Sequence, residues 1–329
     1  MWAVFSGRTL WMAAAAPAAV ALNSPKYLAL LDTLSQKHQF DRAALRSLFG
    51  QVSLKPEIIA TFDRPPENLA FHAYRKRFIT DALIDRGRAY LAEHQTMLHA
   101  VEGDFGVPKE IICGILGVET KFGQPGLEKY RAFDVLNTAF ALYARREAFY
   151  RDEIVQFLIL CREENLDALS VRSSYAGAMG VPQFMPSSAR KYAFDYDGDG
   201  KRNLWSAHGD IFASVANYLR TFGWEKDGLL SLPARLMRDT PQARAELGAR
   251  KTMFIADAAR RGIDIQSPTP SPLGKQDEVS FAFYEPREGE ERLLALFKNF
   301  RALISYNASV NYSLTVLDLS ARLATPAPT

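Results

Sequence analysis

Apolar residues recur at helical spacing through most of the first two thirds of the chain. Ser24 and Pro25 suit the cap and first turn of a helix, and Phe71 to Met97 keeps near-helical spacing over a long stretch. Val52 to Pro66, which prolines interrupt, is expected to connect these helices. Five further helices are predicted, at Lys109 to Phe122, Ala132 to Tyr143, Glu147 to Glu163, Ser187 to Phe194 and Asp210 to Phe222. The pattern predicts a helical body.

The pattern changes after Pro233. Val279 to Tyr284 alternates as a half-buried strand does, and Leu293 to Phe297 and Ala302 to Tyr306 suit further strands. Residues 234 to 275 are charged, and we expect a helix there followed by a proline-rich loop. We therefore predict a mainly α (α+β) protein, in which the C-terminal region forms a small antiparallel sheet beside the helical body.

The N-terminus has the composition of an export signal. Arg8 is the one charge before Lys26, and Leu10 to Leu22 is an Ala-rich apolar run that ends in a small-residue cleavage site. Because the run is too short to favour a spanning helix, we expect residues 1–21 to be a signal peptide and the protein to be periplasmic. The alternative is an uncleaved apolar helix. No Cys lies near the cleavage site, so no lipid anchor is expected there.

Composition and charge exclude little more. The chain has 329 residues, of which 48% are hydrophobic, enough for one large or two modest domains. Its 40 basic and 37 acidic residues leave a net charge of +3, too even a mixture for nucleic-acid binding, although it would tolerate an anionic cell-wall polymer. Cys113 and Cys161 lie in predicted helices. We expect them to be buried thiols, with a single disulfide as the alternative.

Glu119 is the first candidate for chemistry. It lies four residues after Ile115 and eight after Ile111, so it points along the same helix face as these apolar residues. Lost hydration and the negative end of the helix dipole both favour its protonated form. A carboxyl group held in that form can act as a general acid on a glycosidic oxygen.

A small-residue turn follows at residues 174 to 186. Gly177 and Gly180 allow close approach of the backbone to a ligand, and Ser174 and Gln183 supply hydrogen-bonding groups. Each motif alone is more often simple packing, but together they indicate carbohydrate cleavage.

The two motifs and four others resemble the lytic murein transglycosylase B family over residues 25 to 320. The others are Arg145-Arg146, Asp195 to Trp205, Ser214 to Tyr218 and Tyr306-Asn307. The resemblance implies a lysozyme-like helical catalytic domain at residues 22–233, a C-terminal region at 234–323 that folds back over the cleft, and a tail at 324–329. It also implies cleavage of peptidoglycan between N-acetylmuramic acid and N-acetylglucosamine. We expect the protein to be a monomer.

In that family one Glu acts without a second catalytic carboxylate, and here it is Glu119. The acid protonates the leaving oxygen, then takes the proton of the muramic acid C6 hydroxyl, which closes onto C1 to give a 1,6-anhydro sugar. Spacing alone does not exclude hydrolysis, in which a second carboxylate would act with Glu119. Four carboxylates lie close enough in sequence to be considered, but we expect all four on solvated helix faces: Asp134, Glu147, Asp152 and Glu153.

The resemblance also supplies the saccharide-binding positions. Ser174 and Asn307 would orient the N-acetyl group, and the tyrosines would give flat surfaces for sugar rings. Phe149 departs from the pattern, since we expect a tyrosine there. The binding positions fall on Arg145, Ser174, Gln183, Tyr218, Tyr306, Asn307 and Tyr312.

An acidic loop follows at residues 195–210. Asp195, Asp197 and Asp199 occupy positions one, three and five of a calcium-binding EF-hand loop, with Gly200 at six. Position twelve is Ser206 rather than Glu, and the family resemblance places Asp210 in that role. We expect calcium bound by Asp195, Asp197, Asp199, Asp210 and the Lys201 carbonyl, with an unmetallated turn as the alternative. No catalytic metal is expected.

Two rival functions remain open. One is a lysozyme-type hydrolase acting on the same glycan. The other is a calcium-stabilised wall-binding protein that has kept the cleft and lost activity.

Overall fold

The structure is a computed structural model, and it describes residues 19–63, 69–268 and 273–325. Most of these residues are helical. The predicted signal peptide lies almost wholly outside the described residues. The helices are α1 (Pro25–His38), α2 (Arg42–Phe49), η1 (Pro56–Ile58), α3 (Ile59–Phe62), α4 (Phe71–Arg75), α5 (Asp81–Glu93), α6 (Gln95–Phe105), α7 (Lys109–Thr120), α8 (Ala132–Leu142), η3 (Ala144–Arg146), α9 (Glu147–Glu164), α10 (Pro186–Tyr192), α11 (His208–Thr221), α12 (Pro241–Ala245), α13 (Ile255–Arg260), α14 (Lys298–Tyr306) and α15 (Val310–Ala324).

Two small sheets accompany the helices. β1 (Tyr130–Arg131) and β2 (Arg172–Ser173) form an antiparallel pair within the helical body. A five-stranded antiparallel sheet has the order β4-β6-β7-β3-β5. The strands of this sheet are β3 (Ser231–Leu236), β4 (Met253–Phe254), β5 (Ile263–Ile265), β6 (Glu278–Arg287) and β7 (Glu290–Leu296). The helical body and this small C-terminal sheet confirm the predicted α+β class.

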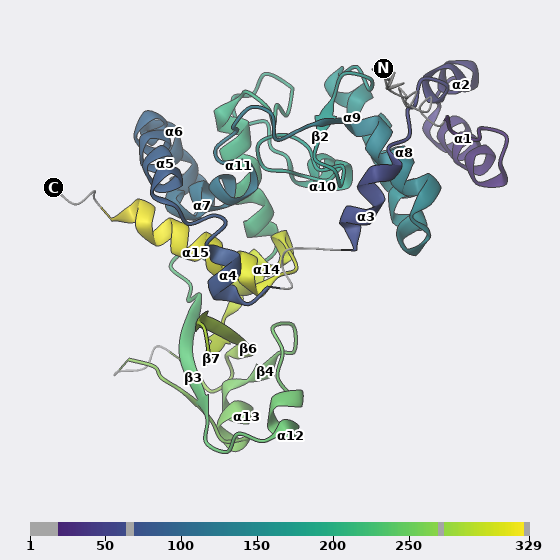
Figure 1. Ribbon diagram of the computed structural model, residues 1–329. Helices are drawn as coiled ribbons and strands as arrows, with labels where there is room; N and C mark the ends of the chain where they lie inside the picture. The colour runs from purple at the N-terminus through teal and green to yellow at the C-terminus, as the bar shows by residue number, and fades with distance from the viewer. Residues whose placement is uncertain (1–18, 64–68, 269–272, 326–329) are drawn as a thin grey trace, which may run out of the picture.

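The sheet forms its own lobe below the helices (Figure 1). Side chains alternate along β6, so Phe281 packs with Ala258 of α13 on one face, while Ala282 faces the helical body on the other. There the sheet meets Phe71 of α4 and Phe300 of α14. The helices α4, α14 and α15 therefore connect the sheet to the main core.

The helix that carries Glu119 packs closely along α15. A Cβ atom added at Gly114 of α7 would lie 2.2 Å from the Ser320 hydroxyl oxygen, and one at Gly117 would lie 2.6 Å from a methyl carbon of Leu319. Both contacts are shorter than van der Waals separation, so the two glycines let the backbones approach. This packing brings the C-terminal helix beside the end of α7.

Two element predictions are wrong. Ala302 to Tyr306 belongs to helix α14 and not to a strand, because it is buried against the core through Leu303 and against the sheet through Ile304, which hides the helical period. The stretch from Phe71 to Met97 is divided among α4, α5 and α6. Thr80 begins α5 by accepting a hydrogen bond from the Leu83 amide, 3.2 Å from its hydroxyl oxygen.

Cys113 and Cys161 are both buried and unpaired, which confirms the expected free thiols. Burial raises the pKa of each thiol to about 12, so neither ionises near neutral pH. Across residues 19–63, 69–268 and 273–325, the structure contains no helix with the length and apolar character needed to cross a membrane.

Candidate functional site

Glu119 lies in the last turn of α7. Ile111 and Ile115, on the same face, are buried, while Glu119 itself is half-buried. Lys121, directly after the helix, has a left-handed backbone conformation (φ 51°), which ends the helix and turns the chain away. The carboxyl group therefore stands at a helix end, partly withdrawn from water, as the sequence predicts.

Two tyrosines from the C-terminal helices surround this position. The Tyr312 hydroxyl donates a hydrogen bond to Glu119 Oε1 at 2.7 Å. The Tyr306 ring stacks parallel to that of Tyr312, with centroids 6.4 Å apart. Burial, and secondly the Glu119 charge, raise the pKa of both tyrosines well above its ordinary value. Both hydroxyls therefore remain protonated donors at neutral pH.

The small-residue turn reaches the same place. The Tyr306 hydroxyl donates to the Pro182 carbonyl oxygen at 2.7 Å, and the Thr120 hydroxyl donates to the Val181 carbonyl oxygen at 2.9 Å. Gln183 has a left-handed backbone (φ 53°), and its side-chain amide donates to the Gly180 carbonyl oxygen at 2.9 Å. The turn is thus attached to α7 and to α14 on either side of Glu119.

Tyr218 extends the aromatic surface. Its ring meets that of Tyr306 edge to face at 4.8 Å, and its hydroxyl donates to the Ser305 carbonyl oxygen. Phe184, from the turn, lies 5.7 Å from the Tyr306 ring. Asn307 directly follows Tyr306 and is half-buried at the end of α14. Of the predicted positions, Tyr312 contacts Glu119 directly, Tyr306 stacks on Tyr312, and Tyr218 packs against Tyr306. Asn307 adjoins Tyr306 in the chain, and Gln183 belongs to the turn that Tyr306 contacts.

Ser174 lies at the start of the same turn, and Arg145 lies in η3, between α8 and α9. The Ser174 hydroxyl oxygen accepts a hydrogen bond from the Ala178 amide at 3.2 Å, so it shapes the turn. Arg145 is largely exposed and pairs with Asp63 at 3.1 Å. Between them, the Tyr150 ring contacts Phe62, and its hydroxyl lies 3.4 Å from the Ala176 carbonyl oxygen. The rings of Phe62 and Tyr150 thus lie between Arg145 and the turn that contains Ser174.

Phe149, where the family pattern suggests a tyrosine, lies in the same region. The Arg146 guanidinium stands 3.9 Å from the centre of its ring, a cation–π contact. A hydroxyl is not needed for this contact.

The expectation that four nearby carboxylates lie on solvated faces is wrong for two of them. Asp134 is 4% exposed, and its Oδ1 accepts a hydrogen bond from the Ser53 amide at 2.9 Å, which ties α8 to the loop between α2 and η1. Glu153 is 3% exposed because it holds the Ser187 amide at the start of α10. Both are committed to structural contacts.

The other two carboxylates have exposed ion pairs. Glu147 pairs with Lys26 at 3.2 Å, and Asp152 with its neighbour Arg151 at 2.8 Å. All four carboxylates thus have partners that suit a structural role.

The acidic loop draws three carboxylates together. Asp195, Asp197 and Asp210 each offer an oxygen within 4.8 Å of the others. Burial raises the pKa of Asp210, the amides of Tyr196 and Asn203 lower it, and the charges of Asp197 and Asp195 raise it further. Oxygen donors on a Gly-containing loop are what calcium prefers, so the donor set fits that ion.

Asp199 lies beside this group. Its Oδ1 accepts a hydrogen bond from the Lys201 amide at 2.7 Å, while both oxygens of Asp195 accept from the amides of Gly198 and Gly200. These bonds hold the loop in a tight turn. Asp199 is not among the three carboxylates whose oxygens lie within 4.8 Å of one another.

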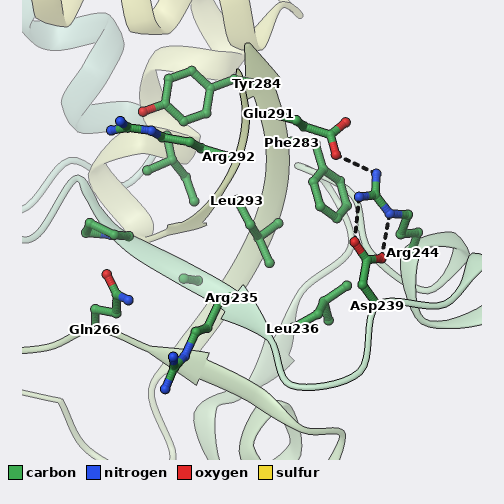
Figure 2. Close-up of a pocket in the computed structure, with 13 residues that line it drawn as sticks. Arg235, Leu236, Asp239, Arg244, Gln266, Phe283, Tyr284, Glu291, Arg292 and Leu293 are labelled. Carbon is green, nitrogen blue, oxygen red and sulfur yellow. Dashed lines mark hydrogen bonds and ion pairs between the residues drawn. The ribbon is translucent and has the colours of Figure 1, made fainter. Parts of the chain in front are cut away.

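A hollow of about 470 Å³ lies on the five-stranded sheet and is lined by none of the candidate site residues described above (Figure 2). Three arginines line it, but each has an acidic partner: Arg235 pairs with Asp264, Arg292 with Glu290, and Arg244 with both Asp239 and Glu291. Among the described residues that line the hollow, each arginine charge is thus balanced by a carboxylate.

Two residues that the sequence analysis did not single out contact the turn. Thr120 follows Glu119 directly in the chain, and this adjacency to the predicted acid could have pointed to it. Glu128 Oε1 accepts from the Gly180 amide at 2.6 Å. It lies in an irregular loop where no spacing pattern points to it.

Comparisons with known proteins agree with this geometry. Residues 23–321 match the family model described as "Transglycosylase SLT domain". Membrane-bound lytic murein transglycosylase B of Escherichia coli K12 is 34% identical over 313 residues, which cover 92% of this chain and 83% of that protein.

Solved structures show the same similarity. The lytic transglycosylase SltB1 of Pseudomonas aeruginosa superposes with a TM-score of 0.83 at 34% identity, covering 92% of this chain and 97% of that one. Escherichia coli Slt35, solved in complex with calcium, gives 0.81 at 32% identity and covers 94% and 96%. The chain therefore belongs to the transglycosylase SLT domain family and is a lytic transglycosylase.

Proposed function

We propose that this enzyme cleaves the β-1,4 bond between N-acetylmuramic acid and N-acetylglucosamine in peptidoglycan and leaves 1,6-anhydromuramic acid ends. One observation carries the proposal: the half-buried Glu119 at the end of α7 accepts a hydrogen bond from Tyr312, one of two stacked tyrosines contributed by a distant segment. Its neighbour Thr120 and the second tyrosine, Tyr306, both bind the small-residue turn. The lytic murein transglycosylase B of Escherichia coli is named for the same polymer, which supports this substrate.

Glu119 acts as both acid and base in this proposal. Its carboxyl first protonates the glycosidic oxygen, which leaves with the N-acetylglucosamine side of the chain. The carboxylate then accepts the proton of the muramic acid C6 hydroxyl as that oxygen bonds to C1. The proton count balances without water, so no second catalytic carboxylate is required.

The surrounding residues hold the glycan. The tyrosine rings at 218, 306 and 312 offer flat apolar surfaces to sugar faces. Gln183, Ser174 and Asn307 supply donors and acceptors to the N-acetyl group, and Arg145, on the opposite helical group, takes a more distant part of the strand.

Calcium is proposed as a structural ion. Asp195, Asp197 and Asp210 would supply its carboxylate ligands, and Asp199 and the Lys201 carbonyl would complete the loop. The structure of Slt35 in complex with calcium supports this proposal. When bound, the ion would neutralise the gathered carboxylates and fasten the loop to α11.

Replacing Tyr312 with Phe is expected to lower kcat about tenfold. A hydrogen bond between uncharged groups contributes about 0.5–1.5 kcal/mol, and here the bond orients the Glu119 carboxyl group, which the proposal holds protonated before cleavage. The ring stays in place, so we expect the Tm to fall only slightly. The measurement is the rate of glycan cleavage by the variant.

Tyr27→Phe is the matched control. Tyr27 is equally buried, and its hydroxyl lies 3.2 Å from Asn137 Oδ1, remote from Glu119. Equal rates in the two variants would remove Tyr312 from the orienting role.

The product distinguishes the proposed reaction from its rivals. Purified enzyme is incubated with sacculi, and the released fragments are analysed by mass spectrometry. Anhydro ends are expected. Reducing muramic ends would identify a hydrolase, and binding without any loss of turbidity would identify a wall-binding protein that lacks activity.

For the localisation, we propose export to the periplasm, where the polymer lies. The apolar run at residues 10 to 22 supports this proposal. Sequencing the N-terminus of the mature protein after periplasmic release tests it, and an intact Met1 would contradict it.

A further inference from the structure

The turn that binds Thr120 and Tyr306, the neighbours of Glu119, has a left-handed backbone at two positions, Gly180 and Gln183. Gly180 has a φ of +70°, and a Cβ atom there would lie 2.7 Å from the Leu204 carbonyl oxygen. Gln183, three residues later, is also left-handed. Such conformations persist where neighbouring groups fix them, so the contacts of this turn determine where Gln183 lies relative to the acid.

Several of those contacts are hydrogen bonds of backbone groups. The Val181 amide donates to the Leu204 carbonyl oxygen at 2.8 Å, and the Val181 and Pro182 carbonyl oxygens accept from Thr120 and Tyr306. Met179 and Phe184 pair across the turn. The Gly180 amide takes no part in that pairing, and its partner is a side chain.

That partner is the Glu128 carboxylate. Its Oε1 accepts from the Gly180 amide at 2.6 Å, and the Trp205 side chain donates a second hydrogen bond to it. Glu128 is half-buried, in a small cavity of about 260 Å³ that Thr120 and Arg172 also line. It is thus committed to the turn and, through Trp205, to the acidic loop at residues 195–210.

Glu128 comes from the same stretch of chain as the acid. Residues 119 to 128 begin at Glu119, contact Val181 through Thr120, leave α7 at Lys121, and return to hold Gly180 through Glu128. One short segment therefore carries Glu119 and also binds two adjacent residues of the turn, Gly180 and Val181. These two bonds both oppose movement of the turn relative to the segment that carries Glu119.

We propose that Glu128 is a positioning residue for catalysis: by accepting the Gly180 amide, it fixes the 180–183 turn against Glu119. The proposal rests on the proposed function of Glu119. Glu128 neither protonates the glycan nor contacts it; it sets the distance between the acid and the sugar that the turn holds.

The test compares Glu128→Ala with Glu128→Gln on soluble glycan strands. A displacement of about 1 Å at a reacting centre costs as much as a hundredfold in rate, so we expect Glu128→Ala to lower kcat at least tenfold, with KM changed less. Gln keeps an oxygen that can accept the Gly180 amide, so Glu128→Gln is expected to restore kcat to within about threefold of the wild type.

Hydrogen exchange of the Gly180 amide gives a readout independent of activity. Exchange is expected to accelerate at least about tenfold in Glu128→Ala, because the amide loses its partner, and to stay near the wild-type rate in Glu128→Gln. Lys129→Ala, at an exposed neighbouring position, is the control for both measurements.

Wild-type kcat in Glu128→Ala, or an equal loss in the Ala and Gln variants, would overturn the proposal. If Glu128→Ala does not fold, the Gln variant decides: near-normal kcat supports a positioning acceptor, and a tenfold loss contradicts it. A wild-type enzyme that releases no fragments would refute the proposed function instead, whereas the exchange of Gly180 would still report on Glu128.

Discussion

Replacing Glu119 with Gln is expected to lower the rate of glycan cleavage by at least about a hundredfold, as loss of a general acid does. Gln has the same shape and can still accept the Tyr312 hydroxyl through its amide oxygen, but it cannot donate a proton to the leaving oxygen. Binding of the glycan should persist, since the tyrosines and the turn remain. Fragment release and equilibrium binding to sacculi are the two measurements.

Glu110→Gln provides the matched control for this variant. Glu110 is a half-buried Glu in the first turn of the same helix, and it pairs with Lys109 at 3.0 Å, away from the turn. Its replacement should leave cleavage unchanged. Near-normal turnover in Glu119→Gln would exclude Glu119 as the acid, and equal losses in both variants would point to damage of α7 as a whole.

Removal of calcium is expected to lower the melting temperature by about 5 °C. An ion at a hundredfold its Kd stabilises the folded state by about 2.7 kcal/mol, and each kcal/mol shifts the Tm of a chain of this size by roughly 2 °C. The reason lies in the carboxylates of Asp195, Asp197 and Asp210, which repel one another without a cation. Calorimetry with and without a chelator makes the measurement.

Asp197→Asn is the informative variant, because Asp197 is exposed and its loss should not unfold the loop. It should weaken the response to the chelator. Asp85→Asn, an exposed carboxylate on α5, should respond as the wild type does. A melting transition that the chelator leaves unchanged would rule out a structural ion.

Sequence patterns predicted the parts of the site in which one helix face or one compact motif decides the outcome. The apolar residues around Glu119 predicted α7 to within two residues of its end, Lys109–Thr120 against an expected Phe122. Alternation along β6 predicted its strand in the same way. The gathering of Tyr306 and Tyr312 with Glu119 was inferred from the family resemblance, because helical spacing carries no information on contacts between distant segments.

Other features leave no such pattern. The Ala302 to Tyr306 stretch is buried on two sides, so its apolar run did not distinguish helix from strand. Asp134 and Glu153 were expected in solvent because their partners, Ser53 and Ser187, lie in other segments. Glu128 acts through the backbone amide of Gly180, and an amide is present at almost every position.

Cleavage in water enriched with oxygen-18 tests the central claim most directly, namely that Glu119 alone closes the C6 hydroxyl onto C1. Released glycan ends are examined by mass spectrometry. Anhydro ends without the heavy isotope are the predicted result, since the oxygen that attacks C1 comes from the sugar. Reducing ends that carry oxygen-18 would show that water is the nucleophile and would contradict it.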